Sequence, residues 1–247
     1  MRKNEIKHGR VISVNAENIW GWGSVAGKMR AARRIKLFID RGAIEKGKNI
    51  LEIGCGTGIF TVGAAETGAN VTAVDISPEL LNIAKTYHVG SNIKYLTEDA
   101  ENMSFADGEF DVVMGNSVLH HLNLSLALPE IHRVLKKGGC ALFSEPNMLN
   151  PQIMLQKKFP PLKKIMGDSQ DETAFFKWSL AGIFREYGFR SVAAAPYDFL
   201  HPAIPEFMIS AMKRLAELAE RIPVLREISG SLFIYAEKPL KAENQNV

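Results

Sequence analysis

The chain has 247 residues, of which 46% are hydrophobic, a composition that suits a single α/β domain with a large core. The formal net charge of +3 and the lack of a long basic run argue against a nucleic-acid partner. The first residues have no apolar signal core, no apolar run reaches transmembrane length, and the two cysteines show neither disulfide-framework nor metal-ligand spacing. We therefore expect a cytoplasmic protein without a metal site or an integral membrane span.

Residues 1–47 precede the first predicted strand and contain a predicted helix at 33–41. A segment rich in glycine, with Trp20 and Trp22, leads toward this helix and ends at Arg30. Two interpretations stay open here. In the first, the tryptophans wall a ligand site and Arg30 binds a carboxylate. In the second, the tryptophans anchor the core and the arginines form a solvated helix face.

The first predicted strand, at 49–53, runs into a turn with three alternating glycines and then a helix at 59–66. The sequence of the turn is Leu-Glu-Ile-Gly-Cys-Gly-Thr-Gly, at residues 51–58. Glycine allows positive φ and a close approach of the backbone to a ligand. A strand, a glycine turn and a helix in this order form the ligand-binding corner of a doubly wound α/β sheet. The residues of this corner that we expect to bind a cofactor are Glu52, Gly54, Cys55, Gly56 and Gly58.

The second predicted strand, at 70–75, ends in an acidic residue. Asp75 suits the two hydroxyls of a nucleoside ribose, and Ile76 follows it at the same edge. A role for Asp75 as a helix cap is the alternative. Ser77 is the better cap, because a proline at the first helical position follows it.

Two further strands are predicted at 92–97 and 110–116. Asp99 and Ala100 come directly after the first of these strands, and Asn116 closes the second. Because parallel strands deliver their carboxyl ends to one edge of a sheet, we expect these residues to lie near the glycine turn.

The next segment places candidate acid–base residues at the same edge. His120 and His121 follow the fourth strand, and Glu145 ends a fifth strand at 140–145. Between them, residues 131–139 predict a helix that ends with basic residues and a glycine stop. His120 and Glu145 are the candidate catalytic residues, whereas a structural hydrogen bond is the favoured role for His121.

Together these motifs resemble, in order and spacing, those of the class I S-adenosylmethionine-dependent methyltransferases. The resemblance covers about residues 48–146 and is closest to the small-molecule, methyltransferase type 11-like branch. It implies a Rossmann-like, doubly wound, seven-stranded, mostly parallel sheet with an antiparallel last strand. The sixth and seventh strands are then expected at 191–199 and 229–238, with a helix at 178–187 before the sixth.

The resemblance also implies the cofactor S-adenosyl-L-methionine, with S-adenosyl-L-homocysteine as product. In this family Asp75 binds the ribose and an acid at the position of Asp99 meets the adenine amino group. A nicotinamide dehydrogenase is an alternative, but it needs the glycine pattern G-x-G-x-x-G, in which Ile59 takes the place of the third glycine. A non-catalytic S-adenosylmethionine-binding protein is a second alternative.

We expect one domain over residues 1–247, with its specificity determined outside the sheet. Residues 1–47 are predicted to cover the cofactor. Residues 147–177 and 201–227 are predicted helical cap insertions, and an amphipathic helix at 204–222 is expected to help roof the acceptor pocket. The substrate is then a small molecule with apolar character, and the protein a monomer or a homodimer.

Overall fold

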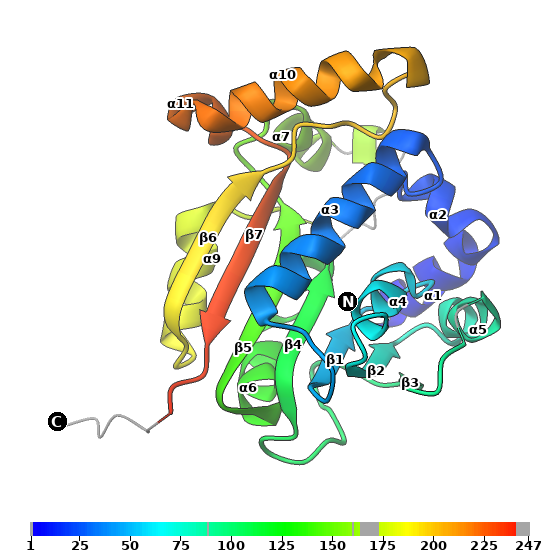
Figure 1. Cartoon of the computed structure of the whole chain (residues 1–247), viewed down its shortest axis with the longest axis vertical. Coiled ribbons are helices and arrows are strands. Elements are labelled where there is room, and N and C mark those ends of the chain that lie inside the picture. Colours follow the sequence, from blue (N-terminus) through cyan, green and yellow to red (C-terminus); the bar gives the residue numbers. More distant parts are fainter. Residues whose placement is uncertain (1, 88, 160, 164–172, 241–247) are drawn as a thin grey trace, which may run out of the picture.

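The computed structural model describes residues 2–87, 89–159, 161–163 and 173–240. Its centre is a seven-stranded sheet in the order β3-β2-β1-β4-β5-β7-β6 (Figure 1). Strands β1 to β5 pair in parallel, and β7 pairs antiparallel with both β5 and β6, as the sequence predicted. The strands are β1 (Asn49–Ile53), β2 (Asn70–Asp75), β3 (Ile93–Thr97), β4 (Phe110–Asn116), β5 (Leu135–Pro146), β6 (Arg190–Tyr197) and β7 (Ser231–Glu237).

Helices cover both faces of this sheet. Successive residues of a strand point to opposite faces, so Ile50 of β1 packs in a cluster with Phe38 on one side, while Leu51 packs in a cluster with Phe184 on the other. The α-helices are α1 (Arg2–Ile12), α2 (Ala16–Ile19), α3 (Val25–Gly42), α4 (Ile59–Ala65), α5 (Pro78–Tyr87), α6 (Leu124–Val134), α7 (Pro151–Lys158), α9 (Lys177–Glu186), α10 (Ile209–Arg221) and α11 (Pro223–Arg226); the 3₁₀ helices are η1 (Ser13–Asn15), η2 (Leu119–His121) and η3 (Glu206–Met208).

The strand order reverses between β1 and β4, which are neighbours in the sheet. In open α/β sheets the crevice outside the carboxyl ends of the strands at such a reversal is the usual place for a ligand. The glycine turn follows β1 at this point, so the predicted cofactor corner lies where the strand order reverses.

The prediction for residues 131–139 was wrong about where the helix ends. Helix α6 ends at Val134, and β5 already begins at Leu135, which pairs with Phe110. The register then shifts within this strand pair, and Gly138 has a φ of +78°. The glycines therefore form a strand irregularity rather than a helix stop.

The amino-terminal region is more helical than the sequence indicated. Helix α3 begins at Val25 rather than near residue 33, because the Ser24 hydroxyl accepts a hydrogen bond from the Gly27 N–H at 3.0 Å and caps it. Helix α1 was not predicted at all. It contacts α5, where Gly9 lies so close to Ser77 that an added Cβ would stand 2.6 Å from the serine hydroxyl.

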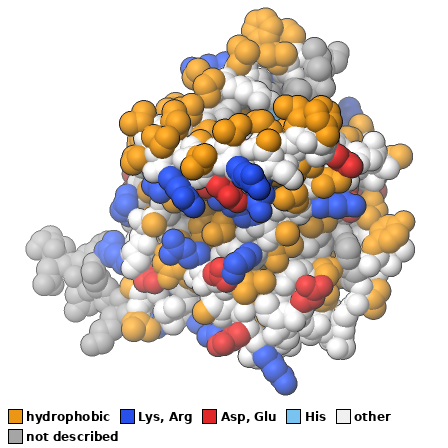
Figure 2. Space-filling model, turned by 45° about the horizontal axis from the view of Figure 1, so that its top comes forward, with side chains coloured by type: hydrophobic (Ala, Val, Ile, Leu, Met, Phe, Trp, Pro, Cys, Tyr) orange, Lys and Arg blue, Asp and Glu red, His pale blue; other side chains and the backbone are white. Residues whose placement is uncertain are grey.

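The two predicted insertions contain α7 and α10–α11. Residues 160 and 164–172 of the first insertion lie outside the described residues. Helix α7 starts with Asn150 as its cap and Pro151 at its first position. Helix α10 packs on α3 in a small cluster that contains Ala26 and Ile209. Its outer side carries exposed apolar side chains at the top of the molecule (Figure 2).

No helix among the described residues is both long and apolar enough to cross a bilayer.

Candidate active site

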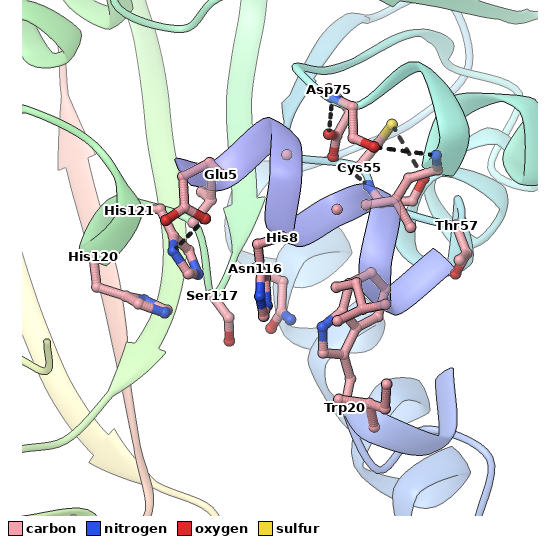
Figure 3. Close-up of a pocket in the computed structure, with 18 of the residues that line it drawn as sticks. Glu5, His8, Trp20, Cys55, Thr57, Asp75, Asn116, Ser117, His120 and His121 are labelled. Atoms are coloured by element: carbon pink, nitrogen blue, oxygen red, sulfur yellow. Dashed lines mark hydrogen bonds and ion pairs between the residues drawn. The ribbon is translucent and has the colours of Figure 1, made fainter. Parts of the chain in front are cut away.

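A cavity of about 660 Å³ opens at the carboxyl ends of β1, β2 and β4. Ligand sites of small-molecule enzymes commonly have this size. Helix α1 forms one wall, and the residues after β4 lie across from it (Figure 3). The predicted cofactor residues that line the cavity are Gly54, Cys55, Gly56, Asp75, Ile76, Asp99, Ala100 and Asn116.

The glycine turn has the backbone conformation that the sequence predicted. Gly54, Gly56 and Gly58 all have positive φ, at +67°, +54° and +87°. A Cβ on Gly54 would stand 2.5 Å from a methyl group of Val118, so no side chain fits there. Gly58 caps α4 and does not line the cavity, so its role is in the turn itself.

Asp75 holds the turn as well as facing the cavity. One carboxylate oxygen accepts a hydrogen bond from the Gly56 N–H at 2.9 Å, and the other accepts one from the Ser77 N–H at 2.8 Å. Burial raises the pKa of Asp75 above its ordinary value, and these backbone donors partly oppose that shift. The residue that caps α5 is Ser77 rather than Asp75. The Ser77 hydroxyl accepts a hydrogen bond from the Leu80 N–H at 3.4 Å.

Glu52 does not reach the cavity. Its carboxyl is buried beneath the turn and accepts a hydrogen bond from the Thr61 hydroxyl of α4 at 2.5 Å. Burial raises the pKa of Glu52 to about 8, and the nearby charge of Asp75 adds to the shift. The geometry therefore gives Glu52 a supporting position between β1 and α4 rather than a direct contact with a ligand.

The two candidate catalytic residues form a buried pair. Glu145 accepts hydrogen bonds from the N–H groups of Val118 and Leu119 with one oxygen, both at 2.9 Å. Its other oxygen lies 2.6 Å from Nδ1 of His120. His120 lines the cavity but Glu145 does not. Glu145 thus positions the turn and the imidazole, and only His120 is placed to meet a substrate.

We expect Glu145→Ala to lower the free energy of unfolding by about 3 kcal/mol, since two buried N–H groups and an imidazole lose their acceptor. Glu145→Gln keeps one acceptor oxygen and should cost less. Urea denaturation followed by circular dichroism measures both. Glu186→Ala, which removes an exposed carboxylate on α9, is the control. Equal stability of Glu145→Ala and this control would contradict the bracing role.

The residues that α1 brings to the site were not predicted. Glu5, His8, Gly9 and Ile12 all line the cavity. Figure 3 shows Glu5 and His8 on this helix, with His121 reaching toward Glu5. Oε2 of Glu5 lies 3.0 Å from Nδ1 of His121, which supports the structural role favoured for that histidine. The sequence signal for this arrangement is slight: Gly9 lacks a side chain, which permits the close approach of α1 to Ser77.

The two tryptophans differ in position, and each fits one of the two interpretations left open above: Trp20 lies at the cavity wall, and Trp22 lies in the core. Trp20 lies against the glycine turn, where a Cβ on Gly56 would stand 3.0 Å from its ring, and it lines the cavity. Trp22 also borders the cavity but is buried in the core, edge-on to Phe60 at 5.6 Å. Arg30 lines the cavity too and is anchored by its Nε to Asp198 at 2.8 Å.

A buried arginine, Arg34, also went unnoticed in the sequence. It donates hydrogen bonds to Asn116 and to Ser231, each at 2.7 Å, and lies 3.3 Å from Asp198. These contacts join α3 to the ends of β4 and β7. Arg34 thereby fixes the side-chain oxygen of Asn116, a predicted cofactor residue.

The cavity fits S-adenosylmethionine, the cofactor that the resemblance implies. The buried hydroxyl of Thr57 lies in the wall and has no hydrogen-bond partner among the described residues. A buried polar group of this kind normally has a partner, which a bound ligand supplies. The backbone of Gly54 and Gly56 lines the same wall, where Asp75 and Asp99 place carboxylate oxygens.

Comparisons with known proteins identify the family. A methyltransferase domain model matches residues 51–143. The chain is 30% identical over 199 residues to a demethylmenaquinone methyltransferase of Chlorobaculum parvum, covering 80% of this chain and 70% of the relative. It is 31% identical over 133 residues to a ubiquinone biosynthesis O-methyltransferase of Coxiella burnetii, covering 51% of this chain and 57% of the relative.

A solved structure of a SAM-dependent methyltransferase from Thermotoga maritima superposes with a TM-score of 0.67 at 18% identity, covering 94% of this chain and 99% of the other. At 18% identity this structural match shows the fold alone, whereas the more similar relatives show the methyltransferase activity. The dehydrogenase alternative has no support. The chain belongs to the class I S-adenosylmethionine-dependent methyltransferases.

Proposed function

We propose that this protein transfers a methyl group from S-adenosylmethionine to a hydroxyl, or to a nucleophilic ring carbon beside a hydroxyl, of a flat, largely apolar small molecule such as a quinol. The observation that carries the proposal is the continuous cavity, which joins the cofactor corner to an apolar wall. That wall includes Ile12, Ile19, Trp20 and Ile153. The activities for which the relatives are named, demethylmenaquinone methylation and O-methylation in ubiquinone biosynthesis, support the same acceptor class.

The chain's own residues hold the cofactor in this proposal. Gly54 and Gly56 present their backbone to it at the cavity wall, and Thr57 offers its hydroxyl. Asp75 binds the ribose, and Asp99 meets the adenine. When bound, S-adenosylmethionine supplies a methyl group on a sulfonium, so positioning of the acceptor is the main task left to the protein.

His120 takes the acceptor proton, and Glu145 is its positioning residue. Glu145 lies against Nδ1, so a proton on Nδ1 points at the carboxylate and the lone pair is on Nε2. His120 borders the cavity, whereas Glu145 is enclosed by the protein. This assignment keeps both predicted catalytic residues but gives them different roles.

Helix α1 and the Trp20 segment close the site in this proposal. The Glu5–His121 pair and the contact of Gly9 with Ser77 hold α1 across the cavity. Water is thereby kept from the reacting groups. Arg30, held by Asp198, is available at the cavity wall for the cofactor carboxylate.

The cytoplasmic location and the monomeric or dimeric state stay predictions. Both cysteines of the chain, Cys55 and Cys140, are free thiols and buried, which is compatible with a reducing compartment. A small-molecule substrate likewise remains a proposal.

A methylation assay on an acceptor panel tests the function. We expect turnover with a reduced naphthoquinone or a polyhydroxylated aromatic carrying an apolar tail, and none with histamine or phosphoethanolamine. His120→Asn, which preserves a donor toward Glu145, should lower kcat at least tenfold and leave the affinity for S-adenosylmethionine unchanged.

His132→Asn, on α6 and away from the cavity, is the matched control. Turnover restricted to amines, at a rate that His120→Asn does not change, would contradict both the acceptor class and the role of His120.

A further inference from the structure

The outer face of α10 and α11 is an exposed apolar surface. Its side chains are between 42% and 86% exposed, far more than a core helix allows. Figure 2, in which the top of Figure 1 is turned forward, shows hydrophobic side chains along this part of the molecule with Lys and Arg beside them. The apolar residues of this outer face are Phe207, Leu215, Leu218, Ile222, Val224 and Leu225.

Helix α10 carries two apolar stripes, of which the fold uses only one. The inner stripe contains Ile209 and Ala216, which are buried, and the first of these packs beside α3. Surface helices of globular domains normally present one such stripe to the core and polar residues elsewhere. The second stripe consists of Leu215 and Leu218 and is exposed. The exposed side chains of Phe207 in η3 and of Ile222, directly after α10, flank it.

The charges beside the outer stripe are mostly positive. Arg214, Arg221 and Arg226 are exposed and form no ion pair among the described residues. The acidic residues on α10 are already engaged, since Glu217 lies 3.7 Å from Lys213 and Glu220 binds Arg33 at 2.7 Å. An apolar stripe with unpaired arginines at its side is the pattern of a helix that lies in a lipid interface.

A second copy of the chain fits this face less well. In a two-fold dimer the same surface meets itself, so the three arginines of each copy approach those of the other. An anionic bilayer offers the opposite charge to these arginines and an apolar layer to Phe207, Leu218 and their neighbours. Charge complementarity therefore favours lipid over self-association.

The outer face is also structurally continuous with the mouth of the cavity. The amide of Asn150, at the start of α7, donates to the Ile228 carbonyl after α11 at 2.8 Å, and Gln152 lies 3.0 Å from His201 ahead of α10. Residues 201–203 and the α7 residues Ile153, Gln156 and Lys157 line the cavity. A bilayer on the outer face would thus adjoin the elements that border the site.

We propose that the outer face of α10 and α11 docks on an anionic lipid surface, with Phe207, Leu215, Leu218 and Ile222 in the interface and the arginines on the headgroups. The docking itself is independent of which acceptor is methylated. If the acceptor has an apolar tail, docking would bring the mouth of the cavity to the membrane, where such molecules reside.

Flotation with vesicles of phosphatidylcholine, with or without phosphatidylglycerol, tests the proposal. We expect the full chain to bind the anionic vesicles, less so as salt is added. The double variant Arg214→Gln/Arg221→Gln should weaken binding about fivefold for each arginine removed. The triple variant Leu215→Gln/Leu218→Gln/Ile222→Gln should abolish it while its circular dichroism and affinity for S-adenosylmethionine stay unchanged.

Leu126→Gln, at an equally exposed leucine on α6, is the control and should bind like the unmodified chain. Sedimentation velocity on the same samples reports self-association. Failure of the unmodified chain to bind anionic vesicles would overturn the proposal, as would equal binding to both vesicle types. A dimer that the triple variant dissociates, without vesicle binding, would identify a second copy as the occupant instead.

Discussion

We expect Asp75→Ala to weaken the binding of S-adenosylmethionine by about a hundredfold or more. If Asp75 accepts both ribose hydroxyls, the substitution removes two charge-assisted hydrogen bonds, each worth roughly 1.5–3 kcal/mol. It also removes the acceptor of the Gly56 N–H, which holds the glycine turn against the end of β2. Both losses act on the cofactor side of the cavity, so the effect should appear in affinity before it appears in folding.

Isothermal titration calorimetry with S-adenosylhomocysteine measures this effect without turnover, and circular dichroism checks the fold. Asp40→Ala is the control, because Asp40 is an exposed acid on α3 whose partner is Lys36. A folded Asp75→Ala protein with unchanged affinity would mean that Asp75 only braces the turn and Ser77.

Local sequence patterns predicted the five parallel strands and the cofactor corner, whereas the antiparallel last strand was expected from the family resemblance. Each parallel strand is a short apolar run between turn residues, and the residues after it meet at one edge by topology alone. The structure accordingly places Asp75, Asp99 and Asn116, which were predicted to lie near the glycine turn, in the wall of one cavity. The start of β5 was less predictable, because the pairing of Leu135 with Phe110 is a long-range contact that ends the helix at Val134 and makes residues 135–139 part of the strand.

The amino-terminal wall had no comparable signal. Helix α1 is mostly polar, and the side of it that meets the cavity consists of Glu5, His8, Gly9 and Ile12. Its position depends on tertiary contacts such as the pair between Glu5 and His121, residues far apart in the sequence. Such contacts leave no periodicity to read.

Only some of the elements predicted to form a roof border the cavity. Ile153 of α7 and the loop at 201–203 border the cavity, whereas none of the residues 204–222 lines it. The amphipathic pattern of that helix was correctly recognised, but amphipathicity does not say which neighbour covers the apolar face. Part of that face covers α3, and part of it is exposed.

We expect Glu52→Gln to stabilise the protein in a strongly pH-dependent manner. Burial raises the pKa of Glu52 from its ordinary value of 4.5 to about 8 in the folded protein. Between these two values the folded chain keeps a proton that the unfolded chain releases, so stability falls as the pH rises through this window. Glutamine cannot ionise and still offers an oxygen to the Thr61 hydroxyl.

The gain in the free energy of unfolding should therefore be close to zero near about pH 4.5 and reach about 5 kcal/mol above about pH 8, which is the size of the pKa shift in free energy. Urea titrations across this range measure it, with Glu45→Gln as an exposed control that should show no such trend. The nearby charge of Asp75 adds to the raised pKa of Glu52, because it disfavours ionisation of the second carboxyl. A Glu52→Gln protein whose stability difference is the same at both ends of the range would show that this carboxyl ionises normally in the folded state.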